Sequence, residues 1–228
     1  MNETNIVSVA IDGPSGAGKS TLARAAAQKL NLIYVDTGAI YRTVALHALR
    51  GGTDPKDAAA VEALLPEIRI TMDYDESGLQ RMKLNGEDVS GLIRTQEVSM
   101  AASAVSAHPP VRAFLLDMQR DMARTRSVIM DGRDIGTVVL PDANVKIFLT
   151  ASSETRARRR WLELKERGTP RDFTQLLQET QRRDEDDANR AAAPLRPARD
   201  AVILDTTELD FDQSLQRIIE IIRERTGS

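Results

Sequence analysis

Five short apolar segments recur along the chain, and longer stretches with helical spacing separate them. They are rich in Val, Ile and Leu and cover residues 6–11, 32–35, 127–130, 145–149 and 201–204. Such runs are typical of strands that are buried on both faces. Because helical stretches alternate with them, the pattern predicts an α/β fold in which helices flank a five-stranded parallel sheet. Ligands of such folds bind at the carboxyl ends of the strands.

One part of the chain interrupts this alternation. Residues 68–74, 80–84 and 87–89 have the pattern of short strands, and Asn85-Gly86 is a strong signal for a tight hairpin turn. The pattern predicts a small antiparallel β-sheet inserted into the α/β core. Helices that return the chain to the core are expected over residues 95–107 and 110–124.

Residues 154–190 are helical in pattern and densely charged, and Gly168-Thr169-Pro170 breaks them in two. Acidic and basic residues are interleaved here, which fits a salt-bridged, solvated surface. Two helices joined by a Gly/Pro turn also fit a mobile lid over bound phosphates. We therefore expect one domain, residues 1–228, that is built from a core of residues 1–64, 108–153 and 191–228, an insertion at about 65–107 and an arm at about 154–190.

The loop after the first predicted strand matches the phosphate-loop pattern G-x-x-x-x-G-K-[ST] at every fixed position. Its glycines let successive backbone N–H groups turn toward phosphate oxygens, while Lys19 reaches the β- and γ-phosphates and Ser20 offers its hydroxyl to Mg²⁺. Residues 19–30 have the composition of a helix, and a helix N-terminus favours an anion. The sequence thus predicts a nucleoside triphosphate site formed by Gly13, Pro14, Ser15, Gly16, Ala17, Gly18, Lys19 and Ser20.

The amino-acid composition indicates which kinds of binding partner to expect. The net charge is only −3 and no tail of like charge stands out, so nucleic-acid and membrane-surface binding are not expected, and the partner is a small molecule. No apolar run is long enough to span a bilayer and the N-terminus lacks the basic region of a signal peptide, which predicts a soluble, cytoplasmic protein. The absence of cysteine excludes disulfides and thiolate chemistry, and His47 and His108 are the only histidines.

Most of the 31 basic residues are arginine, whose planar guanidinium can hold two phosphate oxygens at once. A genome-wide coding preference would produce the same bias, so the number of arginines alone does not indicate phosphate binding. Their positions in the sequence have to be considered instead. Two segments, DTGAIYR at residues 36–42 and DGRDIGT at residues 131–137, follow predicted strands and combine glycine with arginine. Residues 183–190 add a third combination of arginine and acidic residues.

Four aspartates, Asp12, Asp36, Asp131 and Asp205, each close one of the predicted strands. An acidic residue at this place can cap a helix, lie on the magnesium side of a phosphate site or orient another active-site group. Capping is the commonest of the three roles.

In these segments the chain resembles the bacterial cytidylate kinases, from residue 6 to about residue 207. GPSGAGKS, DTGAIYR, EDVSGLIRTQEV, DGRDIGTVV, PDANVKIFLTASSETRARRR and DDANRAAAPL occur in the order of that family with compatible spacing. The resemblance implies a P-loop nucleoside monophosphate kinase with an acceptor-nucleotide insertion and a short helical lid, which uses ATP and Mg²⁺ to phosphorylate CMP or dCMP. Other members often have glycine at the position of Ser20, and the serine restores the usual hydroxyl ligand of Mg²⁺.

The resemblance also implies roles for single residues. The ATP phosphates would bind Gly13 to Thr21. The cytosine would be recognised by Ser103, Arg112 and Asp134, since a carboxylate can accept a hydrogen bond from its exocyclic amine. Asp134 could instead orient Arg133 through a salt bridge. Catalytic roles fall on Lys19, Arg133, Arg159, Arg183 and Arg190. The acceptor site would comprise Ser15, Thr37, Tyr41, Arg42, Ser103, Arg112, Arg133, Asp134, Asp187 and Arg190, although an aromatic such as Tyr41 is more often core packing.

Two other functions fit parts of the pattern. A P-loop kinase that acts on a hydroxyl group would need a carboxylate base, for which Asp36 is a candidate, but a neutral acceptor would leave the many arginines unpaired. A GTPase-type switch would need a guanine-reading N-K-x-D segment, which the sequence lacks. A phosphate acceptor needs no general base, because its second pKa of about 6 makes it mostly a dianion near neutral pH. We further expect the protein to be a monomer.

Overall fold

The computed structural model describes residues 6–76 and 78–227. One sheet has the strand order β2-β6-β1-β7-β8, and every neighbouring pair is parallel. The prediction of a five-stranded parallel sheet is therefore confirmed, and each strand begins and ends within two residues of its predicted bounds. The expectation of burial on both faces is wrong for β8, because this strand lies at the edge of the sheet and Ile203 is 63% exposed. The strands are β1 (Ser8–Asp12), β2 (Ile33–Asp36), β6 (Val128–Gly132), β7 (Val145–Thr150) and β8 (Val202–Asp205).

Helices connect and flank these strands, as the alternating pattern predicted. Side chains cap several of them, and Asp210 and Gln213 form a reciprocal capping box at the start of α8. The α-helices are α1 (Lys19–Leu30), α2 (Thr37–Arg50), α3 (Ala58–Leu64), α4 (Gln96–Val105), α5 (Pro109–Thr125), α6 (Ser153–Glu166), α7 (Phe173–Ala188) and α8 (Phe211–Thr226). Shorter turns are the 3₁₀ segments η1 (Leu65–Glu67) and η2 (Leu92–Arg94) and the π-helical η3 (Ile135–Val139).

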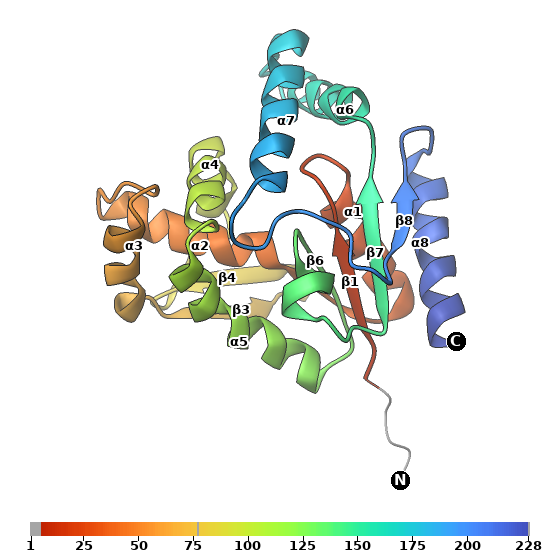
Figure 1. Ribbon diagram of the computed structural model, residues 1–228, viewed down its shortest axis with the longest axis horizontal. Coiled ribbons are helices and arrows are strands. Elements are labelled where there is room, and N and C mark those ends of the chain that lie inside the picture. Colours follow the sequence, from red (N-terminus) through yellow and green to blue (C-terminus); the bar gives the residue numbers. More distant parts are fainter. Residues whose placement is uncertain (1–5, 77, 228) are drawn as a thin grey trace.

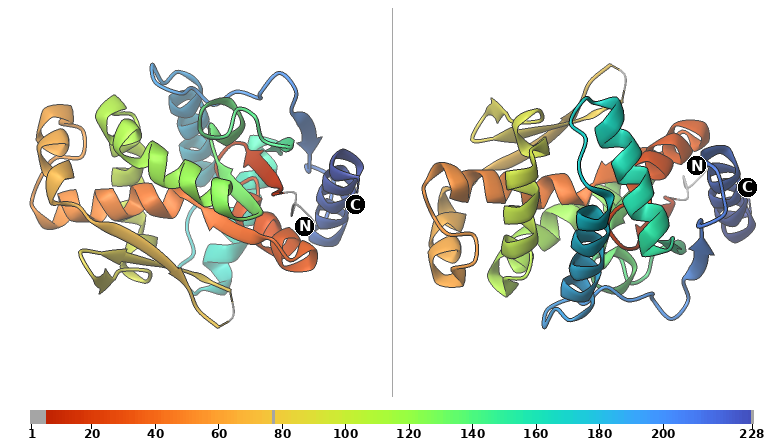
Figure 2. Two further views of the ribbon diagram at one scale, coloured as in Figure 1. Left: turned by 90° about the horizontal axis from the view of Figure 1, so that it is seen from below. Right: turned by 90° about the horizontal axis from the view of Figure 1, so that it is seen from above.

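Alternate residues of the central strands fill two separate hydrophobic layers. Val9 and Ile11 of β1 lie in a cluster with Leu22 of α1 and Ile218 of α8, whereas Ala10 lies in the opposite layer with η3. Burial of each such aliphatic side chain contributes roughly 1.5 to 3 kcal/mol to the free energy of folding. Figure 2 shows α1 beside α8 at one end of the molecule and α3 at the other. No helix within the described ranges is both long and apolar enough to cross a bilayer.

The inserted sheet is also present. Strands β3 (Ile70–Tyr74), β4 (Gln80–Leu84) and β5 (Glu87–Asp88) pair antiparallel in that order. Asn85 and Gly86 both have positive φ, which a two-residue hairpin turn of this type requires. The sheet packs with α2 and α4 around one hydrophobic cluster. The amide oxygen of Gln80 in β4 accepts a hydrogen bond from the backbone N–H of Asp36 at 2.7 Å, which connects the small sheet to the residue that precedes α2.

The charged arm forms two helices, α6 and α7, that pack against each other. Strand β7 leads directly into α6, which ends near Gly168, a residue with φ of +71°. Both helices project beyond the carboxyl ends of the sheet strands (Figure 1). The arm thus lies on the side of the sheet where ligands of α/β folds bind.

We predict that Gly13→Ala lowers the free energy of unfolding by more than about 4 kcal/mol, an exceptional loss for a single substitution. Gly13 has φ of +150°, and an added Cβ would lie 1.9 Å from the carbonyl oxygen of Leu149 in β7. Gly52 also has positive φ, +69°, but nothing lies within 4 Å of its Cβ position, so Gly52→Ala should cost only about 1 kcal/mol. Urea unfolding of both variants measures the difference, and equal losses would refute the steric explanation.

Candidate active site

A cleft of about 740 Å³ lies at the carboxyl ends of the sheet strands, between the phosphate loop, the arm and the end of α4. It brings together most of the residues that the sequence analysis assigned to a site, although they come from distant parts of the chain. Gly13, Pro14 and Asp187 are not among its lining residues. The assigned residues that line it are Ser15, Gly16, Ala17, Gly18, Lys19, Ser20, Thr21, Thr37, Tyr41, Arg42, Ser103, Arg112, Arg133, Asp134, Arg159, Arg183 and Arg190.

The phosphate loop wraps around the N-terminus of α1. Gly16 and Gly18 have φ of +76° and +89°, the left-handed conformation that glycine adopts without strain. Gly18 precedes α1 and offers no side-chain cap, so the first N–H groups of the helix keep their capacity to bind an anion. Lys19 donates to the carbonyl oxygen of Pro14 at 2.7 Å, and burial followed by the nearby Arg133 charge lowers its pKa well below the ordinary value.

A carboxylate that the sequence analysis did not assign to the site lies beneath this loop. Asp131, at the end of β6, accepts a hydrogen bond from the Ser20 hydroxyl at 2.7 Å and another from the Tyr34 hydroxyl at 2.9 Å. Burial and the neighbouring Asp36 raise its pKa. A hydroxyl and a carboxylate are ligands that Mg²⁺ accepts, because this ion keeps several waters and takes its other ligands from phosphates. The pair fits Mg²⁺, although the described residues contain no cluster of three or more metal-binding side chains.

Asp187 organises two of the predicted phosphate-binding arginines. Its side chain is only 1% exposed, and its two oxygens accept hydrogen bonds from Arg133 and Arg190. Burial raises the pKa of Asp187, but Arg133 and then Arg190 bring it below the ordinary value. The structure thus places Asp187 behind the arginines rather than on the cleft surface.

The remaining arginines give the cleft an excess of positive charge. Arg42 pairs with Asp36 at 2.7 Å. Arg183, on α7, has a buried Nε atom without a hydrogen-bond partner, and burial together with the charge of Arg133 lowers its pKa. Among the described residues, Arg42, Arg133 and Arg190 thus pair with only two carboxylates, and Arg183 forms no ion pair. A bound multivalent anion would stabilise this arrangement.

A buried ion pair also lines the cleft. Asp134 pairs with Arg112, and the side chains are 7% and 12% exposed. The alternative in which Asp134 orients Arg133 is wrong for this structure, because Arg133 pairs with Asp187. Burial raises the pKa of Asp134 against the opposing charge of Arg112. The Arg112 guanidinium carbon lies 5.8 Å from the centre of the Tyr41 ring, so Tyr41 contributes to the site as well as to core packing.

Three other residues of the predicted site are also held by hydrogen bonds. The Ser103 hydroxyl is 3.4 Å from Arg190, and the Thr37 hydroxyl donates to the carbonyl oxygen of Asp131 at 2.7 Å. Arg159 donates to the carbonyl oxygen of Thr206 at 2.7 Å. Arg159 is thereby held beside the loop that precedes α8, where it also lines the cleft.

Asp36 is not free to act as a base. One of its carboxylate oxygens accepts from the backbone N–H of Ala39 and caps α2, and the other accepts from Arg42. The expectation that a strand-terminal aspartate caps a helix is confirmed here. A hydroxyl-phosphorylating mechanism with Asp36 as its base has no support in this geometry.

Arg156 is a further residue that the sequence analysis did not single out from its arginine-rich neighbours. It is 4% exposed and donates to the carbonyl oxygens of Ala151 and Ser15, each at 2.9 Å. Its guanidinium also pairs with Asp184 of α7. Arg156 therefore joins the arm to the phosphate loop, a function that no spacing in the sequence could show.

Comparisons with known proteins identify relatives along the whole chain. The sequence model of one family, cytidylate kinase, matches residues 9–224. The cytidylate kinase of Mycobacterium leprae is 50% identical over 226 residues, which cover 99% of this chain and 99% of that protein. The cytidylate kinase of Geobacter sulfurreducens is 50% identical over 217 residues, with coverage of 95% and 93%. A solved shikimate kinase from Acinetobacter baumannii, in complex with shikimate, is 14% identical with a TM-score of 0.46 and coverage of 98% and 97%.

We predict that Arg183→Gln raises the free energy of unfolding in the absence of ligand by roughly 0.5 to 2 kcal/mol, because it removes a buried charge that neighbouring arginines repel. The same change should reduce the stabilisation that inorganic phosphate provides. Arg171→Gln is the matched control, since Arg171 lies in the same arm but forms an exposed pair with Glu179. Urea unfolding with and without phosphate measures both effects. A destabilised Arg183→Gln that still responds fully to phosphate would contradict the interpretation.

Proposed function

The chain belongs to the cytidylate kinase family, and we propose that its cleft holds ATP beside CMP or dCMP in the arrangement described below. The reaction is the ATP-dependent phosphorylation of CMP and dCMP to CDP and dCDP, the activity of a nucleoside monophosphate kinase. One observation carries the assignment of the cleft to this chemistry. Its arginines outnumber their carboxylate partners, and Arg183 has a buried nitrogen without any partner.

The acceptor phosphate accounts for this excess of charge. A nucleoside monophosphate is mostly a dianion near neutral pH, so its oxygen attacks without a general base. What the protein must do is align two anions that repel each other and stabilise a loose transition state. In this proposal Arg42, Arg133, Arg183 and Arg190 do so. Both oxygens of Asp36 already accept hydrogen bonds, which supports a mechanism without a base.

The donor triphosphate binds the phosphate loop in this proposal. The N–H groups at the start of α1 and the Lys19 ammonium contact its β- and γ-phosphates. Lys19 moves from the Pro14 carbonyl oxygen to the phosphate, and the anion restores its pKa by opposing the effect of burial. Ser20 and Asp131 hold Mg²⁺, which when bound neutralises charge on the phosphate oxygens. Arg159 and the loop before α8 border the opposite, nucleoside end of the donor.

The Arg112 and Asp134 pair reads the acceptor base in this proposal. Cytosine presents an exocyclic amine beside acceptor atoms, so the Asp134 carboxylate accepts from the amine while Arg112 and Ser103 donate to the acceptors. Uracil presents the opposite pattern, which leaves Asp134 facing a second acceptor. Asp187 fixes Arg133 and Arg190 from behind the acceptor site.

The arm acts as the lid. Arg183 lies on α7, Arg190 follows that helix, and Arg156 ties the arm to the phosphate loop. Closing the arm over two nucleotides brings these charges onto the phosphates and excludes water, which otherwise accepts the phosphoryl group. We assign the core to residues 1–64, 108–153 and 191–228, the acceptor-nucleotide segment to about 65–107 and the lid to about 154–190. The expectations of a cytoplasmic monomer without nucleic-acid partners stay predictions.

We predict that Lys19→Ala reduces kcat for CMP phosphorylation by about 100-fold or more, the scale for loss of one electrostatic stabiliser of a transition state. A coupled assay with ATP and CMP, dCMP, UMP, AMP or GMP tests the proposed function in the wild-type protein. CMP and dCMP should be the best acceptors. Unchanged turnover in a folded Lys19→Ala protein would refute the phosphate-loop mechanism, and no preference for cytosine nucleotides would refute the proposed acceptor.

We predict that Asp134→Asn reduces kcat/KM for CMP by roughly 10- to 150-fold, which corresponds to loss of a buried hydrogen bond to a charged group of about 1.5 to 3 kcal/mol. The value for UMP should fall far less, because Asp134 does not favour uracil. Both acceptors are measured on one purified variant. Equal losses would show that Asp134 serves only to hold Arg112, since both acceptors depend on the shape of the site.

A further inference from the structure

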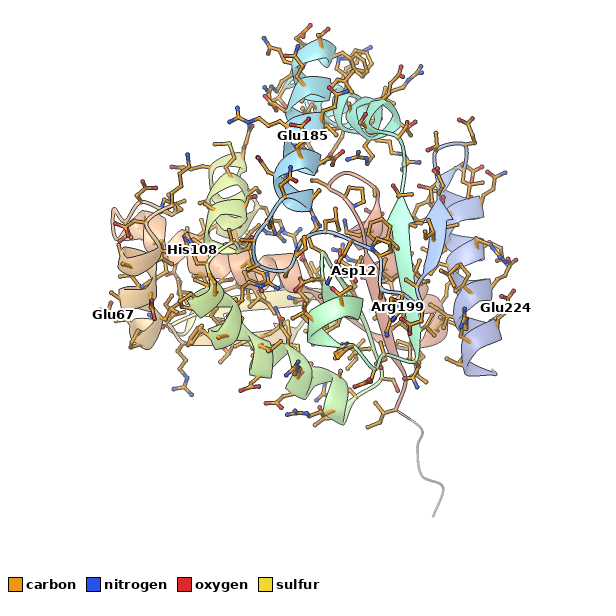
Figure 3. The ribbon with its side chains drawn as sticks, viewed as in Figure 1. Asp12, Glu67, His108, Glu185, Arg199 and Glu224 are labelled. Atoms are coloured by element: carbon orange, nitrogen blue, oxygen red, sulfur yellow. The ribbon has the colours of Figure 1, made fainter. Side chains whose placement is uncertain are left out.

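One buried carboxylate next to the phosphate loop, that of Asp12, has no part in the proposed mechanism. Asp12 is the last residue of β1 and directly precedes Gly13, the first glycine of the phosphate loop. It is 4% exposed, and burial raises its pKa to about 6 against the effect of two backbone hydrogen bonds. Figure 3 shows Asp12 near the centre of the molecule, beside the turn that follows β6.

Both oxygens of Asp12 bind that turn. Oδ1 accepts from the N–H of Ile135 and Oδ2 from the N–H of Gly136, each at 2.7 Å, across 123 and 124 residues of sequence. These donors belong to the first residues of the π-helical turn η3, whose initial N–H groups have no acceptor within the turn itself. Asp12 therefore caps η3 from a neighbouring strand.

The residue that would ordinarily cap this turn is Asp134. It immediately precedes η3, and aspartate in that position usually accepts from the N–H groups of the first turn. Here Asp134 makes no side-chain cap, and its carboxylate pairs with Arg112 in the cleft. The two roles compete for the same carboxylate oxygens, so Asp134 can face the cleft because other oxygens satisfy the turn.

We propose that Asp12 is a positioning residue that takes over the capping of η3 and so keeps Asp134 turned toward Arg112 and the acceptor base. This inference rests on the proposed function in one respect, the reading of the base by Asp134. The charges favour this arrangement, in which Asp12 caps η3 and Asp134 pairs with Arg112. Asp12 and Asp134 repel each other, while Lys19 attracts Asp12. Asp12 thus links the loop that binds the donor to the turn that reads the acceptor.

Asp12→Asn tests the proposal with little change of shape. Its amide oxygen can still accept one of the two backbone N–H groups, but its NH₂ group faces the other donor. The uncapped N–H then attracts the Asp134 carboxylate away from Arg112. We expect the ratio of kcat/KM for CMP to that for UMP to fall about tenfold, the size of one lost hydrogen bond to a charged group.

The double variant Asp12→Asn/Asp134→Asn separates positioning from a structural role. If Asp12 acts through Asp134, the double variant has the same CMP to UMP ratio as Asp134→Asn alone, because the two changes remove one interaction. A purely structural role lowers thermal stability and both kcat/KM values together and leaves their ratio unchanged. Asp205→Asn is the matched control, since Asp205 ends β8 and accepts from Thr207, outside the cleft.

The outcomes are distinguishable. A wild-type protein that does not prefer CMP to UMP refutes the proposed reading of the base, whatever Asp12 does. A wild-type protein that prefers CMP, with an Asp12→Asn variant that keeps the full preference, overturns the positioning role of Asp12 alone. Calorimetric binding of CMP and UMP to Asp12→Asn gives the same comparison without turnover. Selective weakening of CMP binding supports the inference, and equal weakening overturns it.

Discussion

The site depends on positive charge that is buried at the carboxyl ends of the sheet and is not fully neutralised by the protein. Asp187 serves two arginines, and Arg183 is left with a buried, unpartnered nitrogen. We expect such buried, unpaired charges to lower the free energy of unfolding in the absence of ligand, and a bound anion to offset that loss. In the proposed function the same charges favour a phosphate acceptor over a neutral hydroxyl, because only a phosphate would neutralise them.

Three aspartates that end sheet strands each bind a different group next to the cleft. Asp36 caps α2 and pairs with Arg42, Asp131 binds the Ser20 and Tyr34 hydroxyls, and Asp12 satisfies the start of η3. Each is buried, and each has its oxygens occupied by specific donors, as buried carboxylates require. Together they form a polar layer that joins the strands to the loops above them, and Asp205, at the exposed end of β8, lies outside it.

Features that depend on neighbouring residues could be predicted from the sequence by itself. The apolar runs predicted the five parallel strands, since strands that are covered by helices need such runs, although β8 at the sheet edge is only partly buried. Asn85-Gly86 predicted the hairpin because both residues must adopt positive φ. The phosphate loop is local as well, since its glycines and Lys19 act within one turn of chain. Family resemblance then assigned residues to the site, and most of these line one cleft.

The tertiary structure alone decided which groups meet across the sheet. Ser20 and Asp131 are 111 residues apart, and Asp12 binds a turn more than 120 residues away. The partner of Asp134 proved to be Arg112 of α5 rather than its chain neighbour Arg133, because α5 runs beside the turn and Asp187 already holds Arg133. Spacing in the sequence cannot specify such pairs, since side chains choose partners by distance, burial and competition among donors in the folded protein. The sequence by itself determined the sheet, the hairpin and the phosphate loop, whereas the packing of distant elements determined the task of each buried charge.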